Sequence, residues 1–117
     1  MLLLVDPDPQ FQKAATMMLD IRGGIFLARN AQQAKDLMST VGADFSLMMI
    51  DLDLPGQNGF SLLQEMHRNF PDLPIIAISG VLQQAALDSA MLLGAADALR
   101  KPITPAWKIA MARVCAG

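Results

Sequence analysis

The stretch from Leu47 to Gly56 constrains the fold more than any other part of the chain. Four apolar residues, Leu47-Met-Met-Ile50, run directly into Asp51, and a Pro55-Gly56 pair follows closely. An apolar run of this length, closed by a turn signal, is typical of a strand that is buried on both faces of a parallel sheet. Such a strand delivers its last residue to the carboxyl edge of the sheet, where open α/β sheets bind ligands. Asp51 is therefore the first candidate for chemistry.

Short apolar runs alternate with segments of helical periodicity along the whole chain. The spacing of Phe11, Ala14, Ala15, Met18 and Leu19, for example, predicts an inward-facing stripe on a first helix. Five alternations, short connections and right-handed crossovers predict an α/β fold, a doubly wound five-stranded parallel sheet with helices on both faces. The expected strands are 2–5, 25–28, 45–50, 73–79 and 97–100, and one helix is expected after each of them. Asn30 is the expected N-cap of the second helix and Thr104 that of the fifth. The fourth helix is expected to start near Leu82.

Composition narrows the class of protein. A chain of 117 residues with 53% hydrophobic residues suits one domain, 1–117, with one covered sheet. The net charge of -2 argues against direct nucleic-acid binding, which normally requires a basic face. The single cysteine, Cys115, cannot form an internal disulfide, which fits a cytoplasmic location. The apolar runs are shorter than the roughly 18 residues of a membrane span, so no membrane association is expected.

Polar side chains collect where the predicted strands end. Asp6 and Asp8 follow the first strand, Asp51 ends the third, Ser79 ends the fourth and Lys101 follows the fifth. Carboxylate oxygens suit a hard cation such as Mg²⁺, and a cation or the lysine is needed to neutralise clustered acids. A carboxylate can also act as a nucleophile toward phosphorus and form an aspartyl phosphate. The hydroxyl and the ammonium could then hold the transferred phosphoryl oxygens.

These pieces, in this order on a βα repeat, resemble the receiver domain of two-component response regulators, a flavodoxin-like fold. The resemblance covers essentially the whole chain, and although each piece is weak alone, the ordered set is specific. The matching pieces are Leu-Val-Asp6, Met-Ile-Asp51-Leu-Asp-Leu-Pro55-Gly, Asn58-Gly59-Phe, Ile-Ala-Ile-Ser79-Gly80, Gly94-Ala95 and Lys101-Pro102.

The resemblance implies a role for each matching residue. Asp51 would accept a phosphoryl group from a histidine kinase or a phosphotransfer protein. Ser79 and Lys101 would contact that group and relay its presence. Asp53 would supply a backbone carbonyl to Mg²⁺, beside the carboxylates of Asp6 and Asp51. The Lys101–Pro102 peptide is expected to be cis, a form that costs little only before proline.

Two residues depart from the family pattern. Pro7 stands where the family usually has a second acid after the first strand, and that acid is a direct metal ligand. Asp8, one residue further on, could bend back to substitute for it. Ala98 stands where the family often has an aromatic residue that swings inward on activation. Any output of this chain would then use backbone and loop shifts.

Simpler roles exist for several of these residues. The carboxylates of Asp6 and Asp8 could cap the first helix and compensate its dipole. Asp51 could cap a turn, Ser79 could cap the fourth helix, and Lys101 could be a solvated surface lysine.

The departures also motivate an alternative function. In a pseudo-receiver the fold is kept, and a protein partner is bound through the fourth and fifth helices without phosphorylation. Met91, Leu92 and Trp107 on those helices could form such an interface or a homodimer. A flavodoxin-type nucleotide binder shares the architecture, but no glycine- or hydroxyl-rich phosphate loop follows the first strand. The chain contains no output domain, so it is either a stand-alone receiver or a part of a longer regulator.

Overall fold

A parallel sheet of five strands forms the centre of the computed structural model, which describes residues 1–81 and 84–116. The order across the sheet is β2-β1-β3-β4-β5, and every neighbouring pair is parallel. This arrangement confirms the predicted fold class. The strands are β1 (Leu2–Val5), β2 (Ile25–Ala28), β3 (Leu47–Asp51), β4 (Ile75–Ser79) and β5 (Asp97–Arg100).

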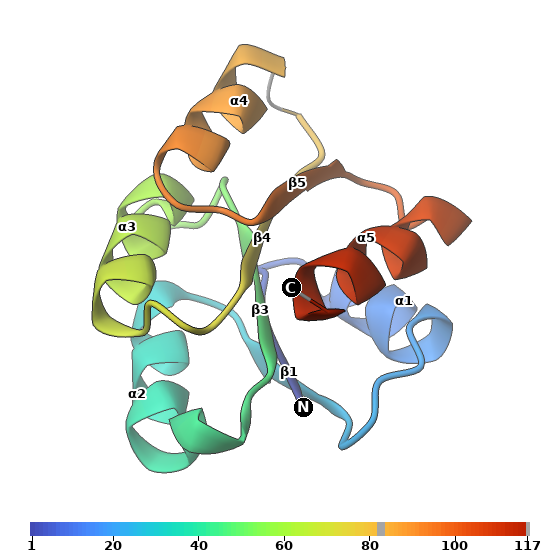
Figure 1. Ribbon diagram of the computed structural model, residues 1–117, viewed down its shortest axis with the longest axis horizontal. Coiled ribbons are helices and arrows are strands. Elements are labelled where there is room, and N and C mark those ends of the chain that lie inside the picture. Colours follow the sequence, from blue (N-terminus) through green and yellow to red (C-terminus); the bar gives the residue numbers. More distant parts are fainter. Residues whose placement is uncertain (82–83, 117) are drawn as a thin grey trace.

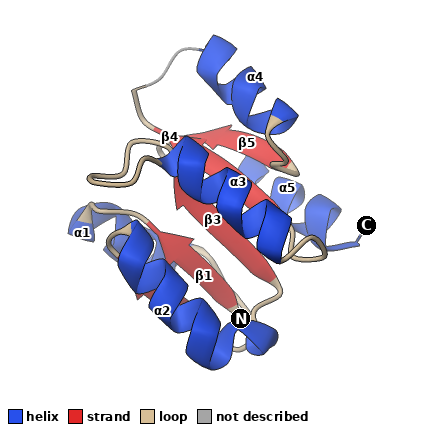
Figure 2. Cartoon of the chain, turned by 90° about the vertical axis from the view of Figure 1, so that its left-hand side faces the viewer, coloured by secondary structure: helices blue, strands red, loops and turns tan. Residues whose placement is uncertain are grey.

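Helices cover both faces of the sheet. The helix α1 pairs with α5 on one face, whereas α2, α3 and α4 cover the other (Figure 1). Figure 2 shows α2 and α3 lying across the sheet, with the arrowheads of β1 and β3 pointing toward the same edge. No helix among residues 1–81 and 84–116 has the length and hydropathy needed to cross a bilayer. The helices are α1 (Pro9–Met18), α2 (Ala31–Val41), α3 (Gly59–Asn69), α4 (Gln84–Leu92) and α5 (Pro105–Ala116), with a 3₁₀ turn at Gly42–Asp44.

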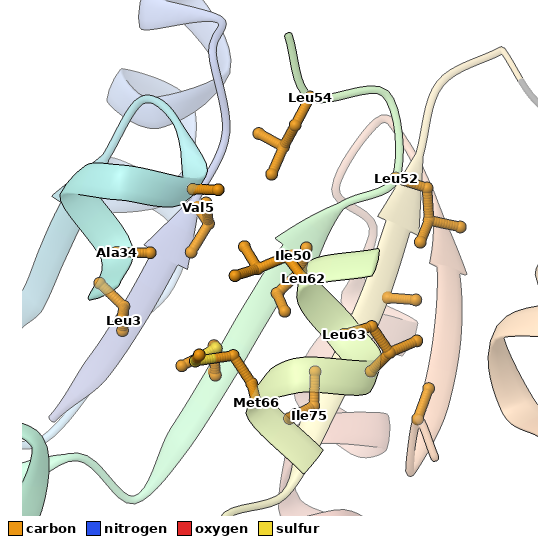
Figure 3. Packing of buried hydrophobic residues seen from close by; sticks show 14 of the residues in the cluster. Leu3, Val5, Ala34, Ile50, Leu52, Leu54, Leu62, Leu63, Met66 and Ile75 are labelled. Carbon is orange, nitrogen blue, oxygen red and sulfur yellow. The ribbon is translucent and has the colours of Figure 1, made fainter. Parts of the chain in front are cut away.

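The alternation of side chains along each strand divides the core into two clusters. Leu2 and Leu4 of β1 point to the α1–α5 face, whereas Leu3 and Val5 point to the α2–α4 face, and all four are fully buried. Figure 3 shows the second of these clusters, in which Leu62 of α3 packs near Ile50 of β3. A sheet buried on both faces explains why its central strands read as continuous apolar runs rather than as alternating patterns.

Short polar side chains begin three of the helices. The carboxylate of Asp8 accepts a hydrogen bond from the Gln10 amide at the start of α1. The amides of Asn30 and Asn58 cap α2 and α3 in the same way. These caps satisfy backbone N–H groups that have no partner inside a helix. The predicted cap at Asn30 is thereby confirmed.

Several local predictions were wrong or fall outside the described residues. Met18 was expected to face the core, but it is the last residue of α1 and is half exposed. Trp107 was expected to face the core, with an interface as the alternative, and its 2% exposure confirms the core position and rules out the alternative. The third strand starts at Leu47 rather than Phe45, because the 3₁₀ turn holds the Phe45 amide on the Gly42 carbonyl. The expected start of the fourth helix at Leu82 lies outside the described residues.

Candidate functional site

Lys101 and two aspartates meet at the carboxyl edge of the sheet. The Lys101 Nζ lies 2.8 Å from Asp6 Oδ2 and 2.9 Å from Asp51 Oδ2. Asp6 is fully buried and Asp51 is 3% exposed, whereas 18% of the lysine side chain is accessible. Asp6 follows β1, Asp51 ends β3 and Lys101 follows β5, so the sheet brings them together from distant parts of the chain. We call Asp6, Asp51, Asp53, Ser79 and Lys101 the acid pocket.

The two buried carboxylates are held in the same local arrangement. The backbone amide of Asp8 donates to Asp6 Oδ1 at 2.8 Å, and that of Asp53 donates to Asp51 Oδ1 at 2.8 Å. Each aspartate thus closes a turn on the amide two residues further on, a common use of this side chain at strand ends. The second oxygen of each carboxylate remains directed toward the lysine ammonium. Turn closure and charge pairing therefore use different oxygens of the same side chain.

Ser79 lies at the end of β4 and connects to Asp53. Its Oγ donates to Asp53 Oδ2 at 3.1 Å and accepts a hydrogen bond from the Val81 amide at 3.2 Å. Its carbonyl accepts from the Lys101 amide at 3.0 Å, which ties the end of β4 to the residue after β5. The Lys101–Pro102 peptide is cis, as the resemblance implied. Sequence reasoning assigned only a backbone role to Asp53 and did not foresee this side-chain contact.

Asp8 is not drawn into the acid pocket in the way that a substitute metal ligand would be. The side chain is exposed, and its Oδ1 is engaged by the Gln10 amide as the cap of α1. The capping role that the sequence offered as an alternative is the one that the structure shows. Pro7, between the two aspartates, brings no donor atom of its own.

Burial and charge shift the titration of two members of the pocket. Burial raises the pKa of Asp6 from 3.8 to about 6, against the opposing effects of Lys101 and the Asp8 amide, and the nearby charge of Asp51 raises it further. Burial alone would lower the pKa of Lys101, but its pairing with Asp6 and Asp51 outweighs that effect and raises the pKa. The lysine is therefore charged at neutral pH, whereas ionisation of the Asp6 carboxyl group at that pH lowers the free energy of unfolding.

The donor atoms present are compatible with a hard divalent cation. Asp6 Oδ2 is a buried oxygen that receives no hydrogen bond of good geometry, although the lysine ammonium is close. A second carboxylate belongs to Asp51, and both are oxygen donors of the kind that Mg²⁺ selects while it retains several waters. Among the described residues, however, no three acidic, histidine or cysteine side chains already cluster as a metal site. The pocket thus supplies a partial ligand set.

Three residues around the pocket were missed by sequence reasoning as parts of the site. Phe11 was predicted only as a core residue, yet its ring lies 4.4 Å from Lys101 Nζ. Gln12, which is 6% exposed, donates through Nε2 to the carbonyls of Asp6 at 2.7 Å and Ala28 at 3.4 Å. Their positions in the first turn after Asp8 are the only sequence signal that could have indicated them.

Gly59 is the third of these residues, and it allows α3 to start directly against the end of β3. A Cβ at this position would lie 2.3 Å from the Asp51 carbonyl oxygen and 2.4 Å from Leu52 Cα. These are backbone atoms, so no side-chain rotation can make room. The Asn58-Gly59 pair was predicted as the end of the loop, and this contact gives the physical reason for the glycine.

Known proteins show the same fold and sequence pattern. The chain is similar to the response regulator SaeR of Staphylococcus aureus, with 27% identity over 104 residues, which cover 89% of this chain and 45% of SaeR. It therefore spans less than half the length of the curated relatives that it matches. Among solved structures, it is similar to a response regulator receiver domain from Clostridium thermocellum, with a TM-score of 0.88 at 21% identity, covering 98% of this chain and 93% of that one.

A second solved structure, like SaeR, is much longer than this chain. The chain is similar to NtrX from Brucella abortus, with a TM-score of 0.86 and 27% identity, covering 98% of this chain but 26% of NtrX. The sequence profile of the response regulator receiver domain matches residues 2–113, which is nearly the entire chain. With the sheet order, the acid pocket and this match in agreement, the chain belongs to the family of response regulator receiver domains.

Proposed function

We propose that this chain is a phosphoacceptor switch in which Asp51 takes a phosphoryl group from a histidine kinase or a phosphotransfer protein. The observation that carries the proposal is the position of Lys101, whose ammonium lies 2.9 Å from Asp51 Oδ2 and 2.8 Å from Asp6 Oδ2. A cation at the end of a buried carboxylate is suited to stabilise negative charge that arrives there. Family membership supports the same role.

The proposed chemistry is an in-line transfer between two nucleophiles. A carboxylate oxygen of Asp51 attacks phosphorus and forms an O–P bond, while the N–P bond of a phosphohistidine breaks. The departing imidazole nitrogen keeps the bonding electron pair and takes up a proton. The Lys101 ammonium pairs with one oxygen of the transferred group, and the Ser79 hydroxyl exchanges its bond with Asp53 Oδ2 for another. The product is a mixed anhydride on Asp51.

Asp6 and Asp51, with the backbone carbonyl of Asp53, are the groups that would hold Mg²⁺. The buried Asp6 Oδ2, which among the described residues accepts no hydrogen bond of good geometry and is paired only with the Lys101 ammonium, supports this assignment. When bound, the ion supplies positive charge that neutralises the phosphoryl oxygens. Pro7 provides no ligand, so we expect weaker Mg²⁺ binding than a site with three carboxylates would give. Asp8, the other predicted Mg²⁺ ligand, could bind the ion only if its carboxylate released the Gln10 amide that it caps.

The proposed partners follow from the family and from exposed side chains. A histidine kinase or phosphotransfer protein is the donor, which places the chain in the cytoplasm. The partial coverage of SaeR and NtrX supports a longer regulator that carries an output domain. Met91 and Leu92 of α4 are 44% and 88% exposed, and they support a homodimer through this side of the molecule. Trp107 is excluded from that surface by its burial.

Treatment with Mg²⁺ and acetyl phosphate, followed by intact mass measurement, tests the proposal. We expect the wild-type protein to gain one phosphoryl group and Asp51→Asn to gain none. Asp44→Asn is the matched control, because Asp44 is an exposed acid in the 3₁₀ turn. It should gain the same mass as the wild type.

The opposite results are equally informative. A wild-type protein without added mass at saturating donor contradicts the proposal and leaves the pseudo-receiver, which binds a partner without phosphorylation. Added mass that persists in Asp51→Asn shows that another residue accepts the group. Metal removal with a chelator should slow the mass gain strongly, since the charge that neutralises the phosphoryl oxygens is then lost.

A further inference from the structure

Lys101 touches an aromatic ring in addition to its two carboxylates. Its Nζ lies over the ring of Phe11, 4.4 Å from the centroid. An ammonium within about 6 Å of a ring centroid is attracted by the negative face of the π-system, and most strongly when water is excluded. Phe11 is 8% exposed, and only 18% of the lysine side chain is accessible. The contact is therefore largely desolvated and adds to the pairing of the ammonium with Asp6 and Asp51.

The ring of Phe11 is itself held in place. The Trp107 ring of α5 lies 5.8 Å away between centroids, at an angle of 52° between the ring planes. Tilted aromatic pairs at this distance are favourable beyond the area that they bury. Trp107 is 2% exposed and belongs to the same core cluster as Leu4 and Met49. Phe11 thus has a charged group at its face and packed core around it.

The first turn of α1 fixes the backbone of Phe11 relative to the strand ends. Asp8 caps the helix at one end of this turn. Gln12, the next residue after Phe11, donates to the carbonyls of Asp6 and Ala28. The turn is therefore closed by its own cap before Phe11 and tied by Gln12 to Asp6, which follows β1, and to Ala28, which ends β2. A ring on an anchored turn, braced by a second ring, is a rigid support for a flexible side chain.

We propose that Phe11 is a positioning residue for phosphoryl transfer, and that its ring face keeps the Lys101 ammonium at Asp51 rather than in solvent. The inference rests on the proposed function. Lysine has a flexible stem with several rotatable bonds, so it loses much conformational freedom when it is held at one point. A preorganised ammonium needs no rearrangement as charge arrives on the phosphoryl oxygens. Phe11 does not touch the reacting atoms and acts only through Lys101.

The molecule offers a matched control on the opposite face of the sheet. Phe45 is 7% exposed, similar to Phe11, and also packs against an aromatic partner, Phe26, at 5.5 Å between centroids. Phe11→Leu and Phe45→Leu remove the same atoms from comparable apolar surroundings, but only the first removes a ring from beneath an ammonium. Phe11→Tyr keeps the ring face and serves as the conservative variant.

Two measurements on the full chain test the inference. The first is the NMR shift of the Lys101 ε-methylene group without any phosphodonor. We expect an upfield ring-current shift in the wild type that disappears in Phe11→Leu, remains in Phe45→Leu and remains in Phe11→Tyr. The second is the rate of phosphorylation by acetyl phosphate with Mg²⁺, per folded molecule. We expect Phe11→Leu to slow the reaction by about three- to thirtyfold, the range that cation–π contacts span from partly exposed to desolvated, and Phe45→Leu to change it less than about twofold.

The outcomes separate this inference from the proposed function. Equal rates in Phe11→Leu and Phe45→Leu, with normal phosphorylation of the wild type, overturn the positioning role and leave the phosphoacceptor function intact. An absent ring-current shift in the wild type also overturns the positioning role. A wild-type protein that gains no phosphoryl group overturns both together. Recovery of the wild-type rate in Phe11→Tyr, beside a slow Phe11→Leu, supports the ring face as the active feature.

Discussion

The two faces of the sheet are packed by the same principles, yet only one of them is joined to the acid pocket through a ring. Each face contains a buried aromatic pair, Phe11 with Trp107 under α1 and α5, and Phe26 with Phe45 near α2. Among the described residues, the single cation–ring contact is that of Lys101 with Phe11. The α1–α5 face therefore combines packing with electrostatics, whereas the α2–α4 face serves chiefly to bury apolar surface.

The largest expected effects come from deleting one large side chain on each face. Trp107→Ala should lower the free energy of unfolding by about 4 kcal/mol and Leu62→Ala by about 3 kcal/mol, because both leave cavities in a close-packed core. If the comparison holds, only Trp107→Ala slows phosphorylation per folded molecule, since Phe11 loses its brace. Denaturant unfolding and acetyl phosphate kinetics measure the two effects. An equal slowing by Leu62→Ala would show that the faces do not differ in this way.

Gly59→Ala should cost about 3 kcal/mol of stability, because the new methyl group would overlap backbone atoms of Asp51 and Leu52. Gly80→Ala is the matched control, since among the described residues its new Cβ would meet only Lys101 side-chain atoms at 3.5 Å and 3.8 Å, an ordinary contact distance. Urea unfolding of both variants measures the difference. Similar midpoints for the two would contradict the close approach of α3 to the end of β3.

Asp6→Asn should stabilise the metal-free protein by about 3 kcal/mol at pH 8, since each unit of raised pKa is roughly 1.4 kcal/mol against the charged form. The pKa of Asp6 rises from 3.8 in the unfolded chain to about 6 in the fold, so the folded state binds this proton more tightly. The contribution of Asp6 to the stability of the wild-type protein is then fully present below pH 3.8, and it is lost as the pH rises through about 6.

The pH dependence provides the check on this prediction. The difference between Asp6→Asn and the wild type should shrink as the pH falls from 8 toward 4, in unfolding curves recorded with a chelator present. A difference that does not change with pH would mean that the charge of Asp6 is fully compensated by Lys101. Saturating Mg²⁺ should reduce the advantage of the variant if the ion binds the ionised carboxylate.

The smallest effect is expected at the outer surface of the α2–α4 face. Lys35 Nζ lies 3.2 Å from Glu65 and 2.6 Å from Gln57 Oε1, which links α2, α3 and the loop after β3. Burial tends to raise the pKa of Glu65, but Gln57 and Lys35 outweigh it and lower the pKa below 4.5. This contribution is therefore present at neutral pH and is lost as the pH falls below that value.

Lys35→Met should cost about 0.5 kcal/mol at pH 7 and low salt, as partly exposed ion pairs do, and less in concentrated salt. Thermal unfolding at two salt concentrations measures it. Lys13→Met on α1 is a suitable control, because Lys13 is exposed. A decrease in the free energy of unfolding above about 2 kcal/mol would show that the contacts around Gln57 stabilise the fold more than an exposed ion pair does.

Much of the fold follows from local patterns, whereas part of the site does not. The run from Leu47 to Asp51 predicted a buried parallel strand because burial on both faces leaves an uninterrupted apolar signal. Strand ends then predicted that Asp6, Asp51 and Lys101 would meet, and the measured distances confirm that proximity. Their chemical roles stay predictions.

The features that escaped prediction depend on contacts between distant segments. Nothing near Phe11 in the sequence indicates that Lys101, which follows the fifth strand, will lie over its ring. Met18 carries a helical period that favours burial, but it ends α1 and is half exposed, whereas the next residue, Leu19, is buried. Asp8 could be read either as a ligand or as a cap, and only the geometry of the Gln10 amide distinguishes the two.

The amide side chain of Gln12 has a mechanical consequence for signalling. By bonding the carbonyls of Asp6 and Ala28, it clamps the ends of two neighbouring strands to the same helical turn. A buried amide with such partners is costly to release, because the Asp6 carbonyl would lose its 2.7 Å donor and the Gln12 amide would lose its acceptors, although the Ala28 carbonyl would keep the Asp6 amide. One wall of the pocket is thus tied to α1, and we expect a new group on Asp51 to displace chiefly the opposite wall.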